Sequence, residues 1–133
     1  MNLLNCSSFT DLKCFTGAFD LEAAILRIGG DYLVAIWGGE KPHIGAVAAA
    51  QSGFARATAS VICFPTHKED EVVRMVSEKL ADALDANVVV TAGMHWDNIS
   101  KEGIGKVMDN TKILAGLILI ALSDSVKILE GEF

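Results

Sequence analysis

The sequence has few of the residues that mark disulfide-rich, disordered or nucleic-acid-binding proteins. It contains three cysteines and two prolines among 133 residues, far below what disulfide scaffolds or proline-rich disordered chains contain. The cysteines have no CxxC spacing, so we expect reduced thiols in a cytoplasmic protein. Lysine and arginine total 11 against 17 aspartate and glutamate residues, a formal net charge of −6. That sign disfavours a nucleic acid as partner.

Long apolar runs are also missing. The longest apolar stretch, residues 113–122, has about half the length that a membrane-spanning helix needs. The first residues have no positively charged lead before an apolar run, so no signal peptide is predicted. Hydrophobic residues make up 51% of the chain and charged residues 21%, a balance typical of a compact core. We therefore expect one domain over residues 1–133, in the cytoplasm and without a membrane contact.

The first half of the chain has the pattern of two β-hairpins. Residues 21–28 and 32–37 are apolar segments on either side of a Gly-Gly-Asp turn, and glycine provides the positive φ that tight turns need. Residues 44–50 and 57–64 flank a polar, glycine-containing connection and repeat this arrangement. We predict two antiparallel strand pairs.

The second half begins with helical periodicity. Residues 72–84 place apolar side chains three and four positions apart. Thr66 and Glu69 match a capping box, in which each side chain bonds a free N–H group at the start of the helix. Residues 87–92 are short and β-branched, which favours a buried strand.

A second long helix is expected from residue 101 to about residue 123, because apolar residues again recur with helical spacing. The pattern of residues 126–129 also permits an edge strand. The sum predicts an α+β fold, in which a largely antiparallel sheet from two hairpins plus a further strand packs against two long helices.

All three histidines lie at the ends of predicted elements, in polar or glycine-containing segments. Gly38 and Gly39 precede His43 in the link between the hairpins, where glycines allow a backbone to approach a ligand closely. His67 and Lys68 lie at the predicted start of the first helix, where free N–H groups favour a phosphate. A turn and a helix cap would also explain these segments without a ligand.

The third segment follows the β-branched strand. His95, Asp97 and Asn98 lie where a strand end often meets a ligand, although Asp97 or Asn98 could equally cap the next helix. The sequence contains no HExxH or CxxC pair, so a metal site would require all three histidine segments to converge. It also contains no GxSxG, Walker or GxGxxG motif, which disfavours the familiar hydrolase and nucleotide-binding classes.

Three segments in order resemble the prenylated-flavin chaperone family (LpdD-like). The segments are Gly38-Gly39-x-x-Pro42-His43-Ile44-Gly45-Ala46-Val47, Pro65-x-His67-Lys68-x-Asp70-Glu71 and Ala92-Gly93-x-His95-x-Asp97-Asn98-Ile99. The family includes the small D subunit of gallate and hydroxyarylic-acid decarboxylases. The resemblance covers most of the chain, from about residue 30 to residue 114.

The resemblance implies a non-catalytic accessory protein. Such a protein binds prenylated FMN, or FMN, and helps to mature it or deliver it to a UbiD-type aromatic-acid decarboxylase, in company with a flavin prenyltransferase. Trp37 or Trp96 would cover the flavin ring. The cofactor-binding residues that the matching motifs imply are Gly38, Gly39, His43, His67, Lys68, His95, Asp97 and Asn98, with no catalytic residue and no metal ligand.

Two other functions stay open from the residues alone. A small enzyme that uses the three histidines as acid, base or metal ligands would have the same side chains. A ligand-free assembly factor, similar to the small proteasome-assembly chaperones, would have a similar order of strands and helices. We also expect a homodimer, because the small apolar residues at 46–50 lie on strands that a small sheet can leave uncovered.

Overall fold

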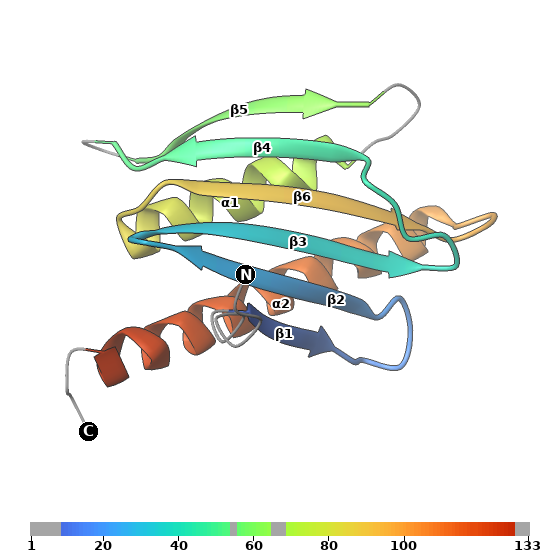
Figure 1. The fold of residues 1–133 in the computed structure, drawn as a ribbon. Coiled ribbons are helices and arrows are strands. Elements are labelled where there is room, and N and C mark those ends of the chain that lie inside the picture. Colours follow the sequence, from blue (N-terminus) through green and yellow to red (C-terminus); the bar gives the residue numbers. More distant parts are fainter. Residues whose placement is uncertain (1–8, 54–55, 65–68, 130–133) are drawn as a thin grey trace, which may run out of the picture.

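The computed structural model describes residues 9–53, 56–64 and 69–129, which form one sheet with two helices on the same face (Figure 1). The elements in chain order are β1 (Phe9–Cys14), β2 (Leu21–Ile28), β3 (Asp31–Gly39), β4 (Ala46–Gln51), β5 (Thr58–Cys63), α1 (Asp70–Leu84), β6 (Val88–His95) and α2 (Lys101–Leu129). The strand order across the sheet is β1-β2-β3-β6-β4-β5. The predicted α+β fold is confirmed. Neither helix, over its described residues, is long and apolar enough to cross a membrane.

Both predicted hairpins are confirmed. β2 pairs antiparallel with β3 around a turn in which Gly29 has a φ of +60°, and β4 pairs antiparallel with β5. The strand predicted at 87–92 forms β6, which extends to His95. β6 lies between the two hairpins, parallel to β3 and antiparallel to β4, and so joins them into one sheet.

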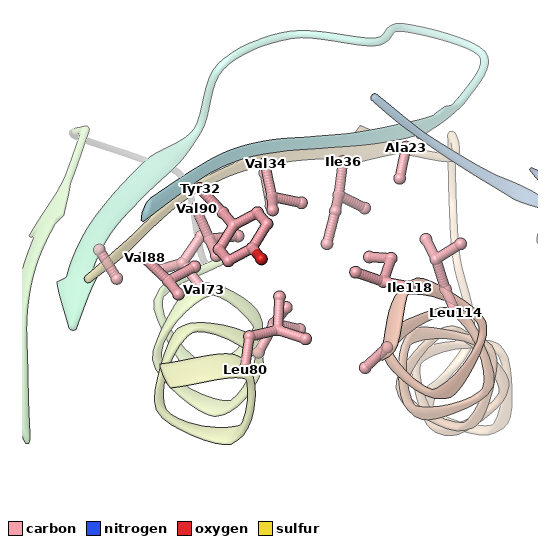
Figure 2. Close-up of a cluster of buried hydrophobic side chains, with 14 of the residues drawn as sticks. Ala23, Tyr32, Val34, Ile36, Val73, Leu80, Val88, Val90, Leu114 and Ile118 are labelled. Atoms are coloured by element: carbon pink, nitrogen blue, oxygen red, sulfur yellow. The ribbon is translucent and has the colours of Figure 1, made fainter. Parts of the chain in front are cut away.

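The core lies between the sheet and the helices. Successive side chains of the central strands point to opposite faces of the sheet. In β3, Val34 and Ile36 are therefore buried, whereas Leu33, next to Val34, is 37% exposed on the other face. Figure 2 shows the buried set meeting side chains from both helices. The helix residues labelled there are Val73 and Leu80 of α1 and Leu114 and Ile118 of α2.

Two features at the ends of the chain differ from the prediction. β1, which pairs with β2, was not expected as a separate strand, because its six residues are few and only partly apolar. α2 continues to Leu129 instead of ending near residue 123, so residues 126–129 are helical and form no edge strand. The segment after residue 122 contains neither glycine nor proline before residue 131, so nothing local stops the helix there.

The predicted capping box at the start of α1 is wrong. The helix begins at Asp70, and Glu69 is its N-cap residue, without a side-chain capping bond in the described residues. Glu69 therefore occupies a different position from the third helical residue that a capping box requires. Thr66 lies outside the described residues. The carboxylate of Glu69 turns inward instead, toward the site described below.

Candidate functional site

A cavity of about 550 Å³ lies where the start of α1, the end of β6 and the first half of α2 meet. Its volume falls in the range of sites for small organic molecules. The lining residues divide by their chemistry into two sets, which are called the apolar wall and the polar wall below. The apolar wall consists of Val72, Met94, Trp96, Ile99, Ile104, Val107 and Met108, and the polar wall of His43, Glu69, Asp70, Glu71 and His95.

Glu69 and His43 both belong to the polar wall and contact each other. Glu69 is 7% exposed, and its Oε1 lies 3.0 Å from Nε2 of His43. The same oxygen accepts a hydrogen bond from the backbone N–H of Met94 at 3.3 Å. Nδ1 of His43 lies 2.9 Å from the carbonyl oxygen of Lys41. The carboxylate is thus held between the loop after β3 and the end of β6.

Two glycines make this arrangement possible. A Cβ on Gly45 would lie 2.9 Å from Glu69 Oε1 and closer still to the rest of the carboxylate, so a missing side chain provides the space for that group. A Cβ on Gly93 would collide with the backbone carbonyl of His43 and lie 3.0 Å from the nitrogen of Ile44. Gly93 therefore lets the His43 backbone cross directly over β6.

A second cluster surrounds His95 at the end of β6. Its Nε2 lies 2.9 Å from Oδ1 of Asp97, and Nζ of Lys41 lies 3.4 Å from the same oxygen. The backbone N–H of Asp97 donates to Glu40 at 3.3 Å. The side-chain hydrogen bond with His95 is the largest cause that lowers the pKa of Asp97 below its ordinary value, followed by a side-chain interaction with Glu40 and the charge of Lys41. His95 is consequently held at the rim of the cavity by an ionised carboxylate.

Trp96 is fixed by the loop before β2. Its ring meets the ring of Phe19 edge-on, with centroids 5.2 Å apart. The buried side chain of Asn110 in α2 donates to the carbonyl oxygens of Ala18 and Phe19, at 3.0 and 2.8 Å, which anchors this loop to the helix. The indole thus has a defined place in the apolar wall. Trp37, by contrast, donates to Glu22 and is absent from the described cavity lining.

Of the eight cofactor-binding residues expected from the sequence, the structure brings two, His43 and His95, to the cavity wall. Asp97 contacts His95 rather than the cavity, and Asn98 occupies an exposed turn with a φ of +54°. His67 and Lys68 lie outside the described residues. No group of three potential metal ligands occurs within the described part of the chain.

Gly38 and Gly39 have close backbone neighbours of their own. A Cβ on Gly38 would lie 2.8 Å from the carbonyl oxygen of Asp20 and from Cδ2 of Leu21. Gly39 has a φ of +85°, and its Cβ would run into the backbone of His95. Close packing against these neighbours therefore explains why both positions are glycine. Their contact with a ligand stays a prediction.

Sequence reasoning missed Glu69 as a site residue, because its position relative to Thr66 suggested a cap. It also missed the apolar wall that α2 contributes through Ile104, Val107 and Met108. The helical spacing of these three residues marks a packed face and gives no sign that part of it borders a cavity.

The fold and the site define a class: an α+β protein with helices on one face of its sheet and a half-apolar cavity at one end of the helix layer. The family model of the prenylated flavin chaperone LpdD-like domain matches residues 16–123. The chain therefore belongs to this family, as its three motifs suggested.

The proteins to which this chain is similar include two that are described here. It is 26% identical over 106 residues to Protein LpdD of Lactiplantibacillus plantarum, a stretch that covers 76% of each chain. One chain in the crystal structure of a chaperone complex for yeast 20S proteasome assembly is also similar, with a TM-score of 0.45 and 11% sequence identity. The match covers 94% of this chain and 98% of that one.

Proposed function

We propose that this protein binds prenylated FMN in the cavity and helps to mature it or deliver it to a UbiD-type aromatic-acid decarboxylase. The observation that carries this proposal is a cavity with one apolar and one polar wall in a member of the prenylated flavin chaperone family. A flavin presents a flat, largely apolar ring system with hydrogen-bonding groups along one edge. Trp96 and the apolar side chains of α2 suit the faces of such a ring, and His43 and Glu69 suit its polar edge.

The exposure of the cavity supports a carrier function. Ile104, which lines it, is 52% exposed, and His95 at the rim has a side chain that is 46% exposed. A ligand can therefore enter and leave from solvent without a large rearrangement of the sheet. A protein that transfers its cofactor needs such an open path, whereas an enzyme gains from excluding water.

The surroundings of the two histidines hold both rings in place. His43 is engaged by the Lys41 carbonyl and by Glu69, and His95 is engaged by Asp97. These contacts orient both rings at the cavity wall. We propose that the protein is not itself a decarboxylase and that the decarboxylase and a flavin prenyltransferase are its partners.

The test measures cofactor loading. The protein is co-expressed with a flavin prenyltransferase, purified and examined by absorbance, and its ability to load an apo decarboxylase is then assayed. We expect His43→Ala and His95→Ala to lower loading, while a decarboxylase that already holds mature cofactor works equally well without this protein. Decarboxylation of an aromatic acid by this chain alone, supplied only with cofactor, would contradict the proposal.

The sheet face opposite the helices supports a homodimer. On the central strands this face carries Leu33 and Val89, which are 37% and 36% exposed, together with Val47 and Ala49. Ala46, Ala48 and Ala50, which the sequence placed in the same surface, are buried on the helix side. In the middle of this face the outward residues are uncharged, whereas Asp31 and Glu22 lie on the same face farther out. In a chain of net charge −6, an uncharged face is where a second copy can approach without electrostatic repulsion.

Light scattering tests the dimer. We expect a mass of two chains for the wild type and of one chain for Leu33→Glu, which would bury a charge in the interface. Ile120→Glu, at a position 61% exposed on α2, is the matched control and should leave the mass unchanged. A wild-type mass of one chain over a wide concentration range would contradict the dimer.

A further inference from the structure

β5 is an edge strand with one open side (Figure 1). It pairs with β4, and no strand of the described residues adjoins its other side. The Phe64 N–H donates to the carbonyl oxygen of Gly45 at 2.9 Å, so these opposite residues mark a hydrogen-bonded position of the ladder. Such positions alternate along an antiparallel pair. The N–H and C=O groups of Ala59 and Val61 therefore point away from β4, toward the open side.

The open edge of β5 lacks the charges and prolines by which proteins commonly protect an edge strand. Its sequence, Thr-Ala-Ser-Val-Ile-Cys, contains neither. β1, at the opposite edge of the sheet, has Asp11 and Lys13 among its six residues. Ile62 of β5 is 68% exposed. An uncharged, open edge of this kind is suited to pair with one more strand.

A second cavity, of about 320 Å³, adjoins the start of this edge. It is lined by Arg56, Ala57, Thr58 and Ala59 at the start of β5 and by Arg74 and Glu78 of α1. Two of the three arginines in the chain thus line one cavity. Glu78 lies 4.0 Å from Arg74, both side chains are partly exposed, and ion pairs of this kind are weak. Because a guanidinium group has five N–H donors, Arg74 can bind a second carboxylate.

The register of the sheet directs one side chain of an added strand toward this cavity. The N–H of Ala57 already donates to Asp82 of α1, so the open part of the edge begins at Ala59. The side chains of Ala59 and Val61 pack against the core on the helix side of the sheet. A residue directly opposite Ala59 on an added strand has its side chain on that same face. Since Ala59 lines the cavity together with both arginines, an acidic side chain at this position would meet them.

We propose that a partner protein adds an extended segment to the open edge of β5, with an acidic side chain opposite Ala59 that binds Arg56 and Arg74. The backbone hydrogen bonds of the edge provide affinity, and the two arginines select the sequence and the register of the segment. This interaction goes beyond the proposed function and does not depend on it. The two cavities share no lining residue in the part of the chain that the structure describes.

The experiment selects and then measures a defined peptide. A random heptapeptide phage library is panned on the purified protein, and the consensus peptide is synthesised together with a version in which the corresponding amide replaces its acidic residue. Dissociation constants are measured by fluorescence anisotropy for the wild type, Arg56→Gln, Arg74→Gln and Lys79→Gln. Lys79 is the matched control, because it is exposed on α1, loses the same charge and is absent from the described lining of this cavity. Amide exchange is followed by NMR with and without the peptide.

We expect the enriched peptides to share one acidic position flanked by β-branched or apolar residues. Arg56→Gln and Arg74→Gln should each weaken binding about fivefold, the effect of a partly exposed charge pair, and the amide version of the peptide should bind the wild type at least about fivefold more weakly. Lys79→Gln should behave like the wild type. At saturating peptide, the amides of Ala59 and Val61 should exchange at least about tenfold more slowly, because the added strand accepts their hydrogens.

The other outcomes overturn the proposal. A library that yields no enriched sequence, or enriched sequences without a shared acidic position, contradicts it, and so does unchanged affinity in both arginine variants. Peptide binding that leaves exchange at Ala59 and Val61 unchanged places the peptide elsewhere. If these two amides are protected without peptide, and more strongly at higher protein concentration, a second copy of β5 occupies the edge instead. None of these results affects the flavin proposal, which the loading assay tests separately.

Discussion

Replacement of Gly93 by alanine tests how the site is built into the fold. The added Cβ would collide with the backbone carbonyl of His43, which has no rotamer by which to move away. The crossing segment is also held by the Gly45 N–H, which donates to the Ala92 carbonyl at 2.9 Å. Overpacking typically costs about 1–3 kcal/mol, and a backbone obstacle places Gly93→Ala at the upper end, about 3 kcal/mol. For a chain of this length, that lowers Tm by roughly 10 °C.

The assay is urea and thermal unfolding followed by circular dichroism, with Gly105→Ala as the matched control. Gly105 is exposed in the first turns of α2, and a Cβ there would meet no atom within 4 Å. Its replacement should stabilise the protein by up to about 1 kcal/mol, because alanine is the better helix former. Gly93→Ala should also weaken flavin binding, since His43 must shift. Unchanged stability and affinity in Gly93→Ala would refute the reasoning from the backbone crossing.

Three further predictions follow from the site. Gly45→Ala should leave Tm within about 3 °C of the wild type, because the flexible Glu69 side chain can move away from the added Cβ. The same shift of the Glu69 carboxylate should weaken flavin binding several-fold. Unchanged affinity would show that flavin binding does not depend on the position of this carboxylate. Asp97→Asn should reduce the loss of stability below about pH 4. His95 lowers the pKa of the Asp97 carboxyl in the folded protein, so this carboxyl stabilises the fold above its unfolded pKa and loses that contribution as the pH falls through its folded pKa. Urea midpoints that depend on pH identically in both proteins would count against this prediction. FMN should bind more tightly than riboflavin, because Lys68 offers a cation for the phosphate, and equal affinities by calorimetry would exclude that contact.

Local sequence patterns determined most of the elements. The Gly-Gly-Asp turn between residues 21–28 and 32–37 fixed a hairpin, since strand alternation and turn chemistry act over only a few residues. The helical spacing from residue 72 likewise fixed the buried face of α1. Family motifs further predicted His43 and His95 as site residues, and both line the cavity.

Long-range pairing was decided by the tertiary structure. β6 pairs in parallel with β3, where Tyr32 meets Val88 across 56 positions of sequence, and the antiparallel contact with β4 completes the sheet. β-branched residues indicate that a segment forms a strand. Which strands it pairs with depends on which apolar faces can be buried together. The site at the ends of β3 and β6 exists only because these two strands lie side by side.

Glu69 illustrates, for a single residue, the difference between what local sequence determines and what tertiary contacts decide. Its sequence neighbourhood favoured a helix cap, which is a local interaction with Thr66. In the structure its carboxylate meets His43, the Met94 N–H and the space beside Gly45, all from distant parts of the chain. The sequence determined that a carboxylate stands at the start of α1. Only the packing of the loop after β3 against β6 decided that it faces the cavity, because that packing brings its partners within hydrogen-bonding distance.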